Sequence, residues 1–157
     1  MEIGGSTSAA GCRFAVIVSR FNAEITTGLL RGALAALRGA GAADADVTVV
    51  RVPGAFELPL TARQLADSGR FDAVIALGCV IKGDTMHFEY IAESVSHGLM
   101  EVSISTRVPV AFGVLTTLDD EQAVVRAADG PGNKGQEAAA AAIEMATLMK
   151  QLPKGRA

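Results

Sequence analysis

Short apolar runs alternate with longer segments of helical periodicity along this chain. Each run is mostly apolar and bounded by turn residues, which is typical of a strand buried on both faces of a sheet. The runs predict four strands, over residues 13–19, 47–52, 72–77 and 108–115.

Between these runs, apolar residues recur every three or four positions and indicate amphipathic helices. We expect Asn22 to cap the first helix and Asp119 to begin the fourth, with Gln122 three residues later as in a capping box. The Gly/Pro-rich residues 129–132 separate the last two helices. The predicted helices cover residues 23–38, about 58–68, about 87–102, a short stretch from 119, and about 134–150.

Strands and helices alternate throughout, which predicts the α/β class: a parallel sheet with helices on both faces. In such sheets, ligands bind beyond the C-terminal ends of the strands. The loops at those ends are residues 19–22, 52–57, 78–87 and 113–118. Residues 1–11 are small and polar, so we expect a flexible arm, or an edge strand that joins a neighbour's sheet, ahead of one domain over residues 12–157.

Composition narrows the classes of function. Hydrophobic residues make up 50% of the chain, the net charge is -3, and no run of basic residues would attract nucleic acid. The apolar stretches are shorter than the roughly 18 residues that a membrane span needs, and residues 1–11 lack the pattern of a secretory signal. Cys12 and Cys79 lie far apart and are expected to be small buried residues in a reducing compartment. We therefore expect a cytoplasmic protein without a nucleic-acid or membrane partner.

The segment 78–90, GCVIKGDTMHFEY, holds the strongest chemical signal. We expect the third strand to stop at Gly78 and a Gly-rich turn to lead into a helix, whose free backbone N–H groups would bind an anion. The spacing of Gly78, Gly83 and Thr85 is that of a P-loop, but Asp84 replaces the lysine that pairs with nucleoside phosphates. An NTPase is therefore excluded, while a cradle for one compact phosphate and an ordinary strand-to-helix turn both remain open.

His87 is the candidate for proton transfer. It lies in the first turn of the predicted helix, beside the anion loop, and imidazole suits proton transfer near neutral pH. Glu89 is close enough in sequence to orient it. A lone histidine is more often structural, and we interpret His97 in that way. The spacing of the two histidines also excludes a metal pair on one helical face.

Three other segments carry candidate ligand-binding residues. Phe21 follows the first strand directly, where an aromatic ring can stack on a ligand or fill the core. Gly54 allows a ligand to approach the backbone. Glu57 can accept hydrogen bonds from hydroxyl groups, or it can simply be a negative charge that the dipole stabilises at a helix N-terminus. Arg126 and Lys134 flank the Gly/Pro-rich residues and could jointly neutralise a phosphate, whereas each alone would be a solvated surface cation.

Six segments, in order, resemble the lumazine synthase family, which catalyses the penultimate step of riboflavin biosynthesis. The central one, ALGCVIKGDTMHFEYI at 76–91, is highly specific, and the six together spread over most of the chain. The other five are SRFN at 19–22, RVPGAFELP at 51–59, PVAFGVLTT at 109–117, EQAVVRA at 121–127 and GNKG at 132–135.

The resemblance implies a transferase that condenses 5-amino-6-(D-ribitylamino)uracil with 3,4-dihydroxy-2-butanone 4-phosphate. The products are 6,7-dimethyl-8-ribityllumazine, phosphate and water, and no metal or organic cofactor is implied. Phe21 would stack on the pyrimidine ring, and His87 would move protons. The other implied site residues are Gly54, Ala55, Phe56, Glu57, Val80 and Ile81 for the ring and ribityl chain; Gly83, Asp84 and Thr85 for the phosphate; and Phe112, Arg126 and Lys134 from the adjacent subunit.

The family resemblance further implies a flavodoxin-like three-layer sandwich around a four-stranded parallel sheet, assembled as a homopentamer with active sites at subunit interfaces. In some members, twelve pentamers form an icosahedral shell, and riboflavin synthase is a candidate partner. Shell-forming members keep a short connection before the last helix. Residues 128–132, ADGPG, keep that length with different residues, among them Pro131, which restricts the local backbone.

Two alternatives stay open at this point. A flavodoxin-like electron carrier is disfavoured because the chain has no Trp and a single Tyr to sandwich an isoalloxazine ring. A catalytically weak flavin- or lumazine-binding shell protein of the same fold would be indicated by loss of Phe21, His87 or Arg126, and all three are present.

Overall fold

The fold is a parallel sheet between two layers of helices. A computed structural model describes residues 1–153, so residues 154–157 of the predicted domain lie outside the described residues. Within residues 1–153, four parallel strands form one sheet in the spatial order β2-β1-β3-β4. The strands are β1 (Phe14–Ser19), β2 (Val47–Val52), β3 (Ala73–Ile81) and β4 (Val110–Thr117).

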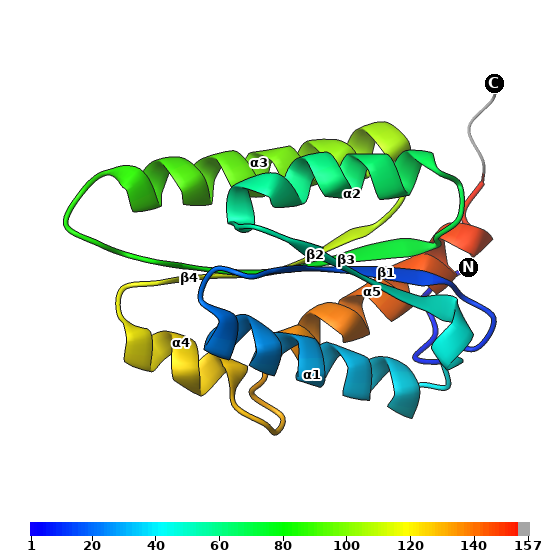
Figure 1. Cartoon of the computed structure of the whole chain (residues 1–157). Coiled ribbons are helices and arrows are strands. Elements are labelled where there is room, and N and C mark those ends of the chain that lie inside the picture. Colours follow the sequence, from blue (N-terminus) through cyan, green and yellow to red (C-terminus); the bar gives the residue numbers. More distant parts are fainter. Residues whose placement is uncertain (154–157) are drawn as a thin grey trace.

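Five α-helices of the described residues cover the sheet (Figure 1). One face carries α1 (Ala23–Gly39), α4 (Asp120–Ala127) and α5 (Lys134–Gln151), and the other carries α2 (Leu58–Asp67) and α3 (His87–Thr106). Two 3₁₀ turns, Asp44–Asp46 and Ala55–Glu57, precede β2 and α2. The predicted flavodoxin-like three-layer sandwich is confirmed. No helix within these residues has the length and apolar character needed to cross a membrane.

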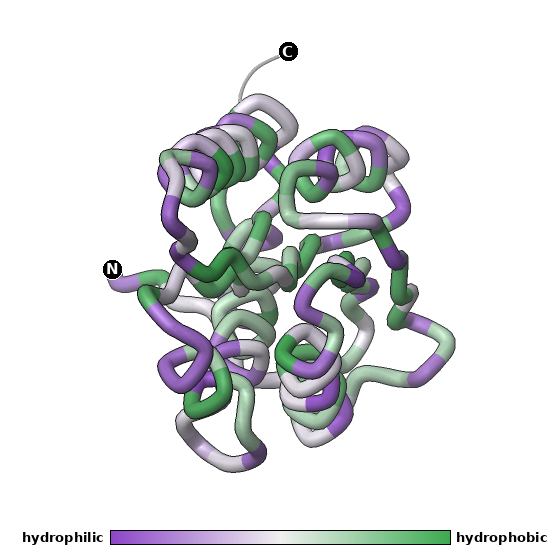
Figure 2. Tube along the Cα trace, turned by 60° about the vertical axis from the view of Figure 1, so that its left-hand side comes forward, coloured by the Kyte–Doolittle hydropathy of each residue, from purple (hydrophilic) through white to green (hydrophobic). Residues whose placement is uncertain are grey.

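The central strand β1 shows why the apolar runs are continuous. Phe14, Val16 and Val18 pack with the layer of α1, α4 and α5, whereas Ala15 and Ile17 pack with α2 and α3. Successive side chains of a strand point to opposite faces, and both faces are covered here, so every residue of β1 is buried. Figure 2 shows hydrophobic residues along the strands in the middle and hydrophilic residues on the outer turns of the helices.

The third strand is longer than predicted. It was expected to stop before Gly78, but β3 runs to Ile81, with Gly78 paired to Val114 and Ile81 paired to Thr117 of β4. The glycine is there for packing rather than for a turn, since a Cβ at this position would lie 3.1 Å from Cδ1 of Leu58. The predicted long Gly-rich loop is therefore wrong: the connection between β3 and α3 is confined to residues 82–86.

The two predicted helix caps behave differently. Asn22 stands at the N-cap of α1 in a left-handed conformation (φ 58°), without a side-chain capping bond. Its amide instead donates to the carbonyl oxygen of Cys79 at 3.0 Å, so the expected side-chain cap is wrong. Asp119 does cap α4, because its Oδ1 accepts the backbone N–H of Gln122 at 2.8 Å. Gln122 Oε1 accepts from the N–H of Leu118 at 3.1 Å, one residue before the usual capping-box partner.

The segment before β1 lies against the ends of α5 and α1. The backbone N–H of Ser6 donates to Oγ1 of Thr147 at 2.7 Å, and the Gln151 amide donates to the carbonyl of Gly4 at 2.8 Å. Ala9 is fully buried. That this segment is flexible, or joins a neighbour's sheet, stays a prediction.

Candidate active site

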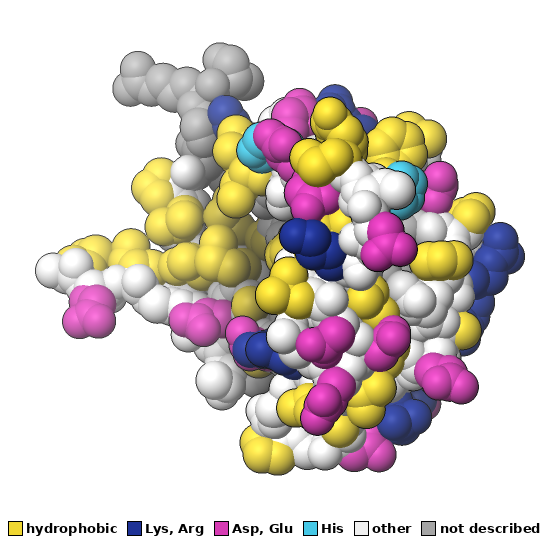
Figure 3. All heavy atoms as spheres, turned by 90° about the vertical axis from the view of Figure 1, so that its left-hand side faces the viewer, with side chains coloured by type: hydrophobic (Ala, Val, Ile, Leu, Met, Phe, Trp, Pro, Cys, Tyr) yellow, Lys and Arg dark blue, Asp and Glu magenta, His cyan; other side chains and the backbone are white. Residues whose placement is uncertain are grey.

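A pocket of about 610 Å³ opens beyond the C-terminal ends of β1, β2 and β3. The chain passes from β1 to β2 on one side of the sheet's centre and from β3 to β4 on the other. The order of the strands therefore reverses between β1 and β3, and doubly wound sheets bind ligands at such a switch point. The volume suits a small molecule. Figure 3 shows this end of the molecule, where hydrophobic side chains are exposed among carboxylates. The predicted site residues that line the pocket are Phe21, Gly54, Ala55, Phe56, Glu57, Val80, Ile81 and His87.

Phe21 is held out of the core. The residue is 72% exposed, and its backbone N–H donates to the carbonyl of Pro53 at 3.0 Å. The next residue, Asn22, binds the carbonyl of Cys79, so the turn after β1 is fastened to the ends of both neighbouring strands. Of the two roles that the sequence left open for this ring, filling the core is excluded, and the ring faces the pocket.

Glu57 is held at the start of α2. Its Oε2 accepts the backbone N–H of Gly54 at 2.9 Å, which closes a turn of residues Ala55–Glu57. Gly54 suits this turn because a Cβ there would lie 3.2 Å from the same oxygen. The bond fixes the carboxylate and leaves Oε1 for a donor from a ligand.

The connection between β3 and α3 carries the three residues predicted to hold phosphate. Gly83, Asp84 and Thr85 are exposed and lie outside the pocket lining, but Ile81 before them and His87 after them both line it. A Cβ at Gly83 would meet nothing within 4 Å, so packing within this chain does not demand glycine there. Thr85 Oγ1 accepts the N–H of His87 at 3.4 Å. The loop thus borders the pocket at the N-terminus of α3.

His87 is the first residue of α3, as predicted, and its side chain lines the pocket. The sequence placed Glu89 close enough to orient it, without establishing a contact. Instead, the ion pair of Glu89 is with Lys82, with 3.5 Å between Oε1 and Nζ. That pair spans the connection from β3 to α3 and ties its two ends together. His97 lies exposed farther along α3.

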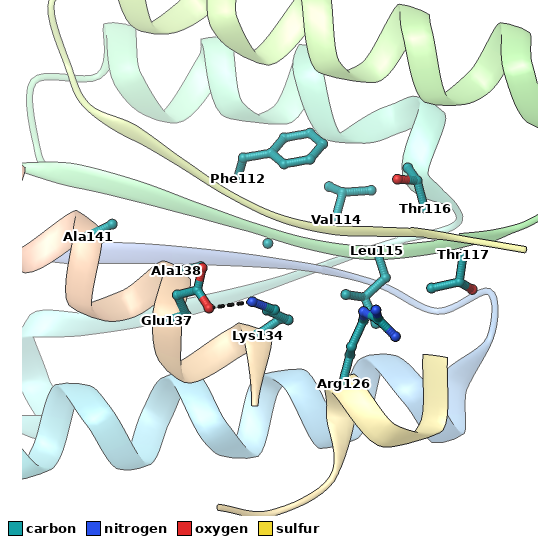
Figure 4. A pocket seen from close by; sticks show the side chains of 11 residues that line it. Phe112, Val114, Leu115, Thr116, Thr117, Arg126, Lys134, Glu137, Ala138 and Ala141 are labelled. Carbon is teal, nitrogen blue, oxygen red and sulfur yellow. Dashed lines mark hydrogen bonds and ion pairs between the residues drawn. The ribbon is translucent and has the colours of Figure 1, made fainter. Parts of the chain in front are cut away.

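Phe112, Arg126 and Lys134 line a second pocket, of about 350 Å³, along the outer edge of β4. Figure 4 shows Arg126 and Lys134 side by side below the strand and Phe112 on its opposite face. Arg126 Nη1 donates to the carbonyl of Gln122 at 3.0 Å, and Lys134 Nζ lies 2.6 Å from Oε2 of Glu137. The residues assigned to an adjacent subunit are therefore together, at a sheet edge, and separate from the first pocket.

The model of the 6,7-dimethyl-8-ribityllumazine synthase family matches residues 11–150 of the 157-residue chain. This chain belongs to that family. Lumazine synthases are transferases of riboflavin biosynthesis, so the activity expected from the sequence is confirmed, and the weakly catalytic alternative is not favoured. The family also implies small-molecule substrates and assembly of identical subunits.

The pocket beyond the ends of β1, β2 and β3 includes five residues that were not predicted as site residues. Asn22 and Pro53 adjoin predicted ones and could have been found from their motifs. Ile91 follows His87 by one helical turn, which puts both on one face of α3. Asp120 arrives from α4 through tertiary packing, which no local signal indicates. The full additional set is Asn22, Pro53, Cys79, Ile91 and Asp120.

The charged side chains that line this pocket are acidic. Glu57 and Asp120 line it, whereas no Lys or Arg is among its described lining residues. Burial raises the pKa of the Cys79 thiol from 9.0 to about 11, and the negative charge of Asp120 adds to the effect. The thiol therefore stays protonated and is not a nucleophile at neutral pH. Within residues 1–153, no three His, Cys, Asp or Glu side chains form a candidate metal site.

Proposed function

We propose that the pocket at the ends of β1, β2 and β3 binds the pyrimidine substrate, and that cations of a neighbouring subunit complete the phosphate site of this lumazine synthase. The observation that carries the proposal is the division of site residues between two pockets. Phe21, Glu57 and His87 meet in one, and Phe112, Arg126 and Lys134 meet in the other.

In the first pocket, the exposed Phe21 ring stacks on the uracil ring, and Val80 and Ile81 cover its edge. Stacking on a preformed aromatic face suits a flat heterocycle. The free Oε1 of Glu57 accepts hydrogen bonds from ribityl hydroxyls, while Gly54 keeps Oε2 in place. These contacts select a ring with a polyol chain.

The phosphate of the second substrate lies at residues Gly83–Thr85, where the N-terminus of α3 favours an anion. A phosphate dianion in this acidic pocket needs positive charge, and the described lining provides none. Arg126 and Lys134 of the adjacent subunit supply it. Arginine is suited to this role because its planar guanidinium binds two phosphate oxygens at once.

The chemistry follows from this placement. The substrate amine attacks the ketone carbonyl and water leaves, forming an imine. Loss of a proton from the neighbouring carbon and departure of phosphate then leave an enol, which takes up a proton at its terminal carbon and loses the hydroxyl proton to become a ketone. The second amine attacks this ketone and closes the ring with loss of another water. His87 carries these protons, while positioning of the two substrates supplies much of the rate. Arg126 stabilises the charge of the leaving phosphate.

We propose a homopentamer as the basic assembly. Contact between copies is supported by exposed apolar residues at the two ends of α3, one pair four residues apart at the start of the helix and one pair near its end, with the exposed Glu93 and His97 between them. These residues are Met86, Tyr90, Met100 and Ile104, each between 60% and 71% exposed. Further assembly into a 60-subunit shell is proposed from the short connection at residues 128–132, with riboflavin synthase as its candidate partner. Cytoplasmic location is proposed from the free cysteines Cys12 and Cys79.

The test is formation of 6,7-dimethyl-8-ribityllumazine from the two substrates, followed by its absorbance and fluorescence. We expect product above the uncatalysed rate, and a Phe21→Ala variant with a raised KM for the pyrimidine and a smaller change for the butanone phosphate. A Phe21→Leu variant controls for loss of apolar area without loss of ring stacking. Equal effects of Phe21→Ala on both substrates would contradict the assigned pocket.

A further inference from the structure

Asn133 stands at the corner between α4 and α5 and is 1% exposed. Its amide nitrogen Nδ2 donates to the carbonyl oxygens of Gly28, Ala127 and Ala128, at 3.1, 3.0 and 3.1 Å. Its Oδ1 accepts the backbone N–H groups of Gly135 and Gln136, at 2.9 and 3.1 Å. Because Nδ2 carries two protons, one proton is shared between two of the three carbonyls, and this single buried side chain contacts three helices.

These bonds complete the ends of two helices. Ala127 is the last residue of α4 and Ala128 follows it, so their carbonyls have no partner within the helix. The N–H groups of Gly135 and Gln136 are equally unpaired at the start of α5. A carboxamide offers donors to the first pair and an acceptor to the second, whereas a carboxylate has acceptors alone.

Three glycines make room for this corner. A Cβ on Gly28 would lie 2.5 Å from the carbonyl oxygen of Ala127, and a Cβ on Gly32 would overlap Oδ1 of Asn133. A Cβ on Gly135 would overlap the carbonyl oxygen of Leu29. Any side chain at these positions would push the α4–α5 corner away from α1, so the corner's position relative to the sheet depends on close backbone contact.

The two residues proposed to bind phosphate, Arg126 and Lys134, are close to Asn133 and its hydrogen-bond partners in the sequence. Arg126 directly precedes Ala127, whose carbonyl Asn133 binds, and Lys134 directly follows Asn133. Arg126 is exposed and Lys134 is half-buried, and their polar contacts are made within their own helices, to Gln122 and Glu137. The relative position of their charges is therefore set by the backbone of the corner.

We infer that Asn133 is a positioning residue for phosphate binding: its amide fixes the spacing of Arg126 and Lys134 so that both cations reach one phosphate group in the neighbouring active site. This inference rests on the proposed function, in which these two residues bind the butanone phosphate. Displacement by about an ångström is enough to cost an enzyme a large factor in rate, so a remote amide can control affinity without touching the substrate.

The test uses Asn133→Ser, which keeps an acceptor at the N-cap of α5 but is too short to reach the three carbonyls. We expect KM for the butanone phosphate and the inhibition constant of inorganic phosphate both to rise by roughly tenfold or more. KM for the pyrimidine should change by less than about twofold, since its pocket is built from other loops. Leu37→Ala truncates a buried side chain farther along α1 and is the control for general loss of stability. It should not selectively weaken binding of the phosphate substrate.

A second variant, Gly32→Ala, displaces Asn133 without changing it and should reproduce the phosphate-selective loss. Adding Asn133→Ser to a variant that already carries Arg126→Ala and Lys134→Ala should weaken phosphate binding by no more than about twofold further, because both groups through which Asn133 acts are then absent. Parallel weakening of both substrates, or full phosphate affinity in either assembled variant, would overturn the inference. If Arg126→Ala itself leaves phosphate affinity unchanged, the proposed phosphate site is wrong instead.

Discussion

The side-chain amide of Asn22 donates to the carbonyl oxygen of Cys79 across 3.0 Å, which joins the turn after β1 to the end of β3. This bond links the turn after β1 to strand β3, and both contribute residues to the pocket proposed to bind the pyrimidine. Because Phe21 directly precedes Asn22 and its ring is mostly exposed, core packing does not hold the aromatic face, and the turn has to.

Asn22→Gly should therefore raise KM for the pyrimidine severalfold. Glycine accepts the left-handed φ of 58° but cannot make the bond, so the ring loses its fixed direction while the backbone fold is kept. Steady-state kinetics with each substrate varied in turn measure the effect. Asn22→Ala adds backbone strain and should also lower the free energy of unfolding, by about 1 kcal/mol. An unchanged pyrimidine KM in Asn22→Gly would show that the bond is dispensable for ligand binding.

Arg126→Ala should weaken the butanone phosphate more than the pyrimidine. The guanidinium lies at the sheet edge, separate from the pyrimidine pocket, and is proposed to pair with phosphate alone. We expect a rise in KM for the phosphate substrate of at least about tenfold, as removing a charge-assisted contact would give. Arg38→Ala, which removes another exposed arginine at the far end of α1, is the matched control. Equal losses for both substrates would count against the assigned role.

His87→Ala should slow turnover without abolishing it. Proton transfer by one positioned side chain contributes part of the rate, and substrate positioning remains in the variant. We expect kcat to fall by about a hundredfold, the low end of what one positioned acid–base group contributes, with little change in either KM. His97→Ala, an exposed histidine on the same helix, should behave as wild type. Complete loss of activity in an intact oligomer would mean that proton transfer dominates catalysis.

Cys79 makes stability depend on pH in the alkaline range. Burial raises the pKa of its thiol to about 11, above its ordinary value of 9.0, so the folded protein holds this proton more tightly than the unfolded chain does. The resulting contribution is complete below pH 9 and is lost as pH rises through about 11. The difference in thermal unfolding temperature between wild type and Cys79→Ala should be smaller at pH 10.5 than at pH 8. A difference that stays constant with pH would argue against a raised thiol pKa.

Much of the fold could be predicted from the sequence because hydrophobic periodicity is local. The run at 13–19 and the helical spacing after it marked β1 and α1 closely. The prediction failed at Gly78, where the need for glycine comes from Leu58, a residue distant in sequence. Asn22 was misjudged for the same reason, since its partner is Cys79 rather than the helix that it begins.

The chemistry of the site was predictable to a similar depth. A histidine beside a Gly-rich segment indicated proton transfer and an anion, and the family motifs added the pyrimidine contacts. Asp120 and Asn133 were beyond sequence reasoning, because the first reaches the pocket, and the second reaches Gly28, through tertiary packing. The division of the site into two pockets likewise depends on where β4 lies in the sheet, at its edge.

The most direct test of the shared active site mixes two impaired subunits. One carries Phe21→Ala with His87→Ala, and the other carries Arg126→Ala; the two are unfolded together and reassembled at equal amounts. If each site combines Phe21 and His87 of one copy with Arg126 of the next, random mixing restores roughly one site in four to the wild-type set, and activity should rise well above that of either parent. If the mixture shows only the average of the two parental activities, the site lies within one chain and the account is wrong.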